Sequence, residues 1–122
     1  MKYISDEDKM RVALDEARKA LDIDEVPVGA AIFDKDDNLI CANHNRRELD
    51  QNPMSHAEIL VLEEASQILG TWRLEETTIA VTLEPDAMCA GAISLSRVKK
   101  LIYGAQNCLL YTSDAADECL CV

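Results

Sequence analysis

The sequence predicts an α/β fold, a three-layer α/β/α sandwich in which helices cover both faces of a mixed sheet. Apolar residues at helical spacing mark residues 6–22 as an amphipathic helix. Residues 28–42 contain two apolar runs separated by turn residues, which is typical of a β-hairpin. Residues 77–103 read as strand, helix and strand, so those two strands should be parallel. Together they give a mixed sheet of about four strands.

The first helix begins with a recognisable cap. Ser5 is followed three residues later by Asp8, a variant of the capping box. The apolar residues behind it form one stripe that we expect to pack on the core: Met10, Ala13, Leu14, Ala17 and Leu21.

The hairpin that follows has strands at 28–33 and 39–42, with turn residues at 34–38. Gly29 inside the first strand indicates either a bulge or a close approach of the backbone to a ligand.

A polar loop at 43–53 leads into a second helix, expected at 56–69 with Ser55 as its cap and Gly70 as its end. His56 and Glu58 therefore lie in the first helical turn. The unpaired N–H groups and the helix dipole at that end add positive potential, which favours an ionised Glu58.

The second half of the chain also contains a helix whose first turn carries a candidate site residue. A strand at 77–83 passes through Glu84 and Pro85 into an apolar helix at 87–95, and a strand returns at 100–103. Cys89 lies one turn into that helix, where the dipole stabilises a thiolate. A hydrolytic zinc site needs three protein ligands, one open position and a nearby carboxylate that does not ligate, and His56, Cys89 and Glu58 supply most of that set.

Composition sets limits on the rest. A chain of 122 residues has room for one small domain. No apolar run reaches transmembrane length, and the first residues are acidic where a signal peptide would be hydrophobic, so we expect a cytoplasmic protein without a membrane partner. The five cysteines form no regular framework, which disfavours disulfides.

The net charge of −11 argues against a nucleic-acid partner held by overall electrostatics. A local basic strip could still bind RNA, although scattered solvated charges would give the same composition. The candidates for such a strip are Arg46, Arg47, Arg97, Lys99 and Lys100.

The motifs taken in order resemble one family. His-Ala-Glu at 56–58, followed by Pro85 and Cys89, is similar to the His-x-Glu and Pro-Cys-x-x-Cys signature of the cytidine and nucleoside deaminase superfamily. Between Met10 and Ala105 the chain resembles bacterial tRNA adenosine deaminases. The matching segments are Val-Pro-Val-Gly-Ala at 26–30, Asn-Arg at 45–46, Gly-Thr-Trp-Arg-Leu at 70–74, Thr-Leu-Glu-Pro at 82–85 and Tyr-Gly-Ala at 103–105.

The resemblance implies the cytidine-deaminase-like fold, one Zn²⁺ per chain and hydrolysis of adenosine to inosine at the tRNA wobble position. The implied roles are zinc ligation by His56 and Cys89, proton transfer by Glu58, and substrate contacts by Asn45 and Val28. The implied partners are a tRNA anticodon stem-loop and a second copy of the chain.

Asp86 stands where the family has its first zinc cysteine. A carboxylate can ligate zinc, but aspartate is also a favoured N-cap, so Asp86 is either a third ligand or only a helix cap. We expect weak or absent catalysis from this substitution.

The resemblance ends after Asn107, so we expect a deaminase domain at 1–107 that lacks the family's C-terminal helices. Residues 108–122 show no helical or strand period and look like translated sequencing-adapter sequence. We interpret them as a tail that is not native to the fold and whose removal costs little stability.

Two other functions stay open. The same core serves deaminases of cytosine, guanine or free nucleosides. A catalytically weak or inactive deaminase-like protein that only binds or dimerises would also fit Asp86 and the tail.

Overall fold

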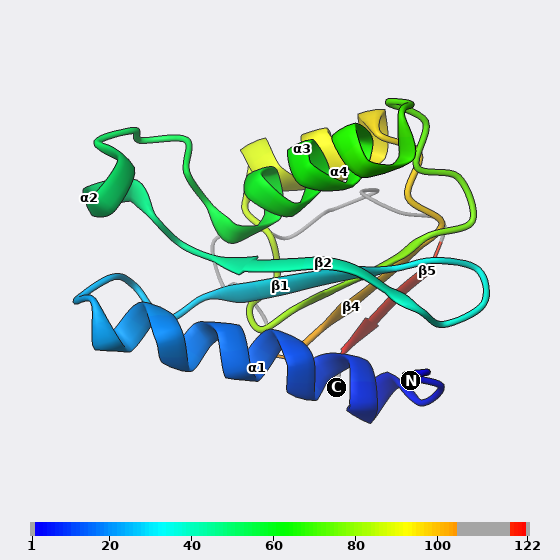
Figure 1. The fold of residues 1–122 in the computed structure, drawn as a ribbon, viewed down its shortest axis with the longest axis horizontal. Helices are drawn as coiled ribbons and strands as arrows, with labels where there is room; N and C mark the ends of the chain where they lie inside the picture. Colours follow the sequence, from blue (N-terminus) through cyan, green and yellow to red (C-terminus); the bar gives the residue numbers. More distant parts are fainter. Residues whose placement is uncertain (1, 105–117, 122) are drawn as a thin grey trace.

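The computed structural model of the chain describes residues 2–104 and 118–121, which contain a five-stranded mixed sheet (Figure 1). The strands lie in the order β2-β1-β3-β4-β5; β1 is antiparallel to β2 and β3, whereas β3, β4 and β5 are parallel. The elements are α1 Asp6–Asp22, β1 Gly29–Phe33, β2 Leu39–His44, α2 Arg47–Asp50, α3 Ala57–Leu69, β3 Thr78–Val81, α4 Ala87–Leu95, β4 Lys100–Tyr103 and β5 Glu118–Cys121.

Helix α1 covers one face of the sheet, and helices α3 and α4 cover the other (Figure 1). Strands β1, β3 and β4 are largely buried for this reason: in β1, Ala31 and Phe33 pack in the α1 cluster, whereas Ala30 and Ile32 pack in the cluster that includes α3 and α4. The predicted three-layer α/β architecture is confirmed.

Gly29 has a different explanation from either one that the sequence suggested. A Cβ atom there would lie 2.0 Å from the carbonyl oxygen of Ala13 and 2.6 Å from the backbone nitrogen of Ala17. The glycine therefore lets α1 lie directly on the first strand. The register irregularity of the hairpin lies elsewhere, between Ile32 and Phe33.

The end of the chain differs from the sequence-based expectation. Residues 118–121 form β5, which pairs in parallel with β4, so the prediction of about four strands missed one. Periodicity did not reveal it, because its sequence, Glu-Cys-Leu-Cys, shows no alternation of polar and apolar residues. The rest of the predicted tail, residues 108–117 and 122, lies outside the described residues. That the tail is foreign to the fold stays a prediction.

Truncation after Asn107 tests that interpretation. Because the β4–β5 ladder would be lost, we now expect the thermal midpoint to fall by about 4 °C or more. A midpoint that changes by less than about 1 °C in differential scanning calorimetry would instead support the tail as foreign.

Within the described ranges, no helix is both long and apolar enough to cross a membrane.

Candidate metal centre

The candidate site lies at one edge of the sheet, where β3 ends and the N-termini of α3 and α4 meet. His56 is the N-cap residue of α3, and Asp86 is the N-cap residue of α4. The strand pairing of Ala30 with Val81 places the start of β1 at the same edge. Two positive helix ends therefore face one small volume, an arrangement that favours anionic groups there.

Three ligand-type side chains converge at this edge. One ligand atom each from His56, Asp86 and Cys89 can be chosen so that all lie within 4.8 Å of one another. Nδ1 of His56 lies 3.7 Å from Oδ2 of Asp86. Cys89 is fully buried, whereas His56 and Asp86 are partly exposed. Folding thus brings together the three residues that the sequence analysis predicts as ligands.

The carboxylate of Asp86 has two different environments. Its Oδ1 accepts a hydrogen bond of 3.0 Å from the backbone N–H of Cys89, which caps α4. Its Oδ2 faces the His56 ring instead. The two interpretations of Asp86, cap and ligand, are therefore geometrically compatible.

Glu58 is buried beside this cluster and lacks a partner for one oxygen. Among the described residues, its Oε1 is the buried side-chain polar atom without a hydrogen-bond partner. Burial raises the pKa of Glu58 to about 7, and the Asp86 charge contributes in the same direction. The expectation that the helix end favours an ionised Glu58 is thus opposed by desolvation. An orphaned buried carboxyl oxygen indicates a missing partner at the site.

The thiol of Cys89 responds to the same surroundings. Burial raises its pKa well above the usual range, and the carboxyl groups of Glu58 and Asp86 raise it further. A cation held between these groups would reverse that effect, because a metal favours a deprotonated thiol and ionised carboxylates. Imidazole, carboxylate and thiolate are all zinc ligand types, so the donor set fits the metal that the resemblance implies.

Asn45 has a structural task that the sequence analysis missed. Its Oδ1 accepts a hydrogen bond of 2.8 Å from the backbone N–H of Ala57, the first residue of α3. His56 makes no capping hydrogen bond with its own side chain, so its ring is not used by the helix. The backbone N–H of Asn45 also donates a hydrogen bond to the carbonyl oxygen of Val28. The two predicted substrate residues therefore lie next to each other at the edge of the sheet where the site is.

Glu25 is a second residue that the sequence analysis missed. Its buried carboxylate accepts backbone hydrogen bonds from Glu48, at 2.6 Å, and from Leu49, and so holds the start of α2 beside the site edge. Partners separated by 23 residues leave no local pattern in the sequence.

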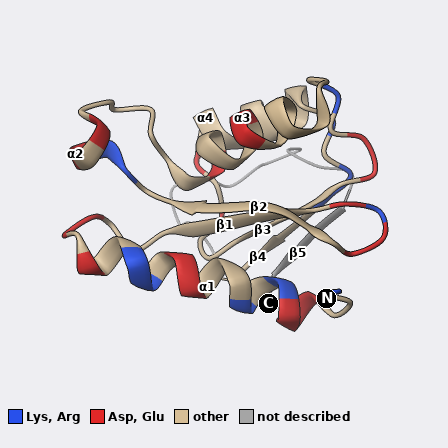
Figure 2. Ribbon diagram, viewed as in Figure 1, with Lys and Arg blue, Asp and Glu red and all other residues tan. Residues whose placement is uncertain are grey.

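The predicted basic strip is not continuous. Arg46 and Arg47 follow β2 at the site edge, but Arg97, Lys99 and Lys100 lie at the opposite edge, where β4 begins (Figure 2). Arg46 is also paired with Asp50 at 3.2 Å.

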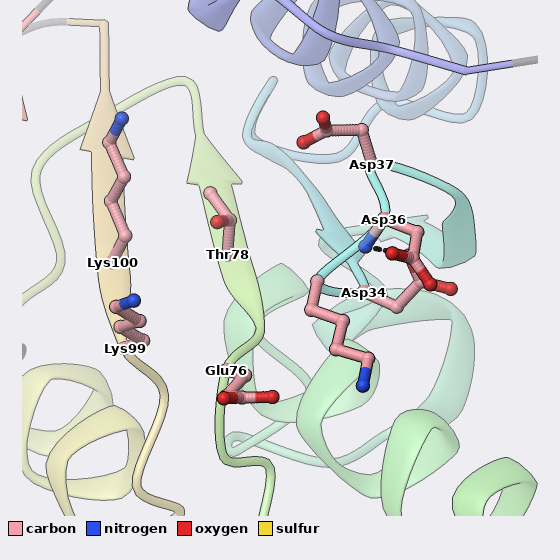
Figure 3. A pocket seen from close by; sticks show the side chains of 8 residues that line it. Asp34, Asp36, Asp37, Glu76, Thr78, Lys99 and Lys100 are labelled. Carbon is pink, nitrogen blue, oxygen red and sulfur yellow. Dashed lines mark hydrogen bonds between the residues drawn. The ribbon is translucent and has the colours of Figure 1, made fainter.

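A cavity of about 510 Å³ lies at that opposite edge (Figure 3). Carboxylates and lysines line it together, among them Asp34, Glu76 and Lys99. It shares no residue with the candidate metal centre.

Comparison with known families gives the class of protein. The family described as MafB19-like deaminase matches residues 4–112, and the chain belongs to this family. The match extends beyond Asn107, where the sequence analysis ended its resemblance. The fold is cytidine-deaminase-like, as in the deaminase structures that superpose on it.

The more specific similarity is to tRNA-specific adenosine deaminases, as the sequence analysis predicts. The enzyme of Bacillus subtilis (strain 168) is 51% identical over 100 residues, which cover 82% of this chain and 62% of that protein. The enzyme of Rickettsia felis is 46% identical over 99 residues, covering 80% of this chain and 69% of that protein. A solved tRNA:A34 deaminase involved in wobble-position A-to-I editing has 44% identity and a TM-score of 0.78, with 81% of this chain and 75% of that chain covered.

The chain spans 57–62% of the length of the first curated relatives that it matches. A guanine deaminase from Bacillus subtilis has the same fold, with 28% identity and a TM-score of 0.81 over 84% of this chain and 66% of that chain.

Proposed function

We propose that the chain is a zinc-dependent hydrolytic deaminase that converts adenosine to inosine at the wobble position of tRNA. The observation that carries this proposal is the convergence of His56, Asp86 and Cys89 beside the buried, unpartnered Oε1 of Glu58. Both parts are needed for hydrolytic deamination: a set of metal ligands, and a separate carboxyl group that moves protons.

The chemistry that zinc supplies when bound by His56, Asp86 and Cys89 is Lewis acidity toward the attacking water. In the net reaction, water adds its oxygen to C6 of the base, the bond from C6 to the amino nitrogen breaks, and ammonia leaves. Glu58 would take one proton of the water on Oε1 and deliver it to the ring nitrogen. It would then take the second proton from the new C6 hydroxyl and give it to the amino group, which leaves as ammonia.

The support for a tRNA substrate comes from the relatives, which are named tRNA-specific adenosine deaminases. We assign recognition of the nucleoside to the side-chain amide of Asn45. We assign the lining of the pocket beside the base to Val28. We assign contact with the anticodon stem-loop to Arg46 and Arg47, which follow β2 at the edge of the sheet where the candidate site lies. This substrate fits the cytoplasmic location expected from the sequence.

We also propose that the protein is a homodimer. Apolar side chains are exposed on the helices that form the outer layer, with Leu95 at 77% and Ile68 at 61%. A cavity of about 390 Å³ between α3 and α4, lined in part by Ile59 and Ala92, extends this apolar surface.

A second candidate is deamination of a free purine such as guanine, because two guanine deaminases superpose with TM-scores of 0.81 and 0.80. A third is a deaminase-like protein without turnover, because Asp86 replaces a thiolate ligand.

Product analysis separates these functions. The zinc-loaded full chain should form inosine, at a low rate, in an anticodon stem-loop with adenosine at the wobble position. It should not form xanthine from guanine or uridine from cytidine. Mass spectrometry of the digested RNA and of the free bases measures all of these products. Xanthine as the main product would favour the guanine deaminase, and zinc binding without any product would favour the non-catalytic protein.

A further inference from the structure

We propose that Asp86 divides its carboxylate between two tasks, with Oδ1 capping helix α4 and Oδ2 acting as the third metal ligand. The inference rests on the zinc site proposed above and concerns how this particular chain builds that site.

The two oxygens are already separated by their contacts. Oδ1 accepts a hydrogen bond of 3.0 Å from the backbone N–H of Cys89, and Cys89 is itself one of the proposed ligands. Oδ2 is 3.7 Å from Nδ1 of His56, too long for a direct hydrogen bond but short enough for both atoms to be ligands of one ion. The side chain is 45% exposed, so an ion can reach it from solvent.

At the start of helix α3, capping and metal ligation are assigned to two different residues. Its N-cap residue, His56, is a ligand that makes no capping hydrogen bond, and Asn45 supplies the cap from another segment. In α4 the capping residue and the ligand are one side chain. The start of each helix is therefore fixed by hydrogen bonds that do not require the metal.

A consequence is that the ligands are positioned before the ion arrives. The metal-free chain should fold cooperatively, unlike small domains whose folding depends on zinc. A thiol at position 86 is a weak hydrogen-bond acceptor and could not provide the same cap.

Three variants separate the tasks. Asp86→Asn keeps a capping oxygen and removes the anionic ligand, whereas Asp86→Ala removes both. Ser5→Ala is the matched control, because Ser5 caps α1 through its Oγ, 3.0 Å from the backbone nitrogen of Asp8, and Ser5 belongs to no ligand group. The readouts are the thermal midpoint of the metal-free full chain and the zinc affinity measured by competition with a chelator.

Asp86→Asn should leave the metal-free midpoint within about 1 °C of the original chain and weaken zinc binding by about 10-fold or more. Asp86→Ala should weaken zinc binding similarly and also lower the metal-free midpoint by about 3–6 °C. Ser5→Ala should lower the midpoint and leave zinc affinity unchanged.

Unchanged zinc affinity in Asp86→Asn would overturn the ligand role, and an unchanged midpoint in Asp86→Ala would overturn the cap. A chain that binds zinc as expected but forms no inosine would instead contradict the proposed function and leave this inference intact.

Discussion

Glu58→Gln is expected to abolish deamination and to leave the fold and the zinc content unchanged. Glutamine has nearly the same shape as glutamate, but its amide cannot take a proton from water and return it to the base. The expected loss is about 10²–10⁴-fold in kcat, the range attributed to general acid–base catalysis. Inosine formation in the anticodon stem-loop measures it, alongside zinc per chain and the thermal midpoint.

The stability of this variant provides an independent check. The Glu58 carboxyl is buried with Oε1 unpartnered, and its raised pKa shows that the charged form is disfavoured there. A neutral amide therefore should not lower the midpoint of the metal-free chain. Glu63→Gln is the matched control, since the same change is made at an exposed position of the same helix. Loss of zinc from Glu58→Gln, but not from Glu63→Gln, would mean that Glu58 is a ligand.

Much of this architecture could be predicted from the sequence because the relevant signals are local. The cap at Ser5, the stop at Gly70 and the turn residues at 34–38 each act within a few positions, and the structure has α1, the hairpin and α3 near the expected places. The predicted cap of α3 by Ser55 is wrong, because His56 is the N-cap residue and Asn45 supplies the hydrogen bond. The candidate ligands could be predicted for a related reason. His56 and Asp86 belong to short motifs at the starts of two helices, and those two helix ends meet at one edge of the sheet.

The remaining features depend on contacts between distant segments, which leave no pattern along the chain. The cap that Asn45 provides for α3 spans 12 residues, and the bond from Glu48 to Glu25 spans 23. Gly29 faces backbone atoms of α1 that are near only in the folded chain. The raised pKa of Glu58 also depends on distant segments, because burial by several elements outweighs the dipole of its own helix.

Asp86→Cys should have opposite effects on the metal-free and zinc-bound forms. Without the capping carboxylate, the metal-free midpoint should fall by about 3–6 °C. The zinc affinity should rise, because a thiolate is a softer and stronger ligand for this ion than a carboxylate. We expect an increase of about 10–100-fold, measured by competition with a chelator. In this variant the introduced thiolate would join His56 and Cys89 around one ion.

Deaminase activity should increase with zinc affinity, provided that the C-terminal helices implied by the resemblance are added to the chain. With them, Asp86→Cys should form inosine in the anticodon stem-loop faster than the equally extended chain that keeps Asp86. The reason is that His56, Cys89 and Glu58 already lie together at two helix ends, so position 86 is the one place where the expected ligand chemistry differs. If both extended chains hold zinc with the same affinity and turn over equally, Asp86 is a fully competent ligand, and the case for an impaired enzyme fails.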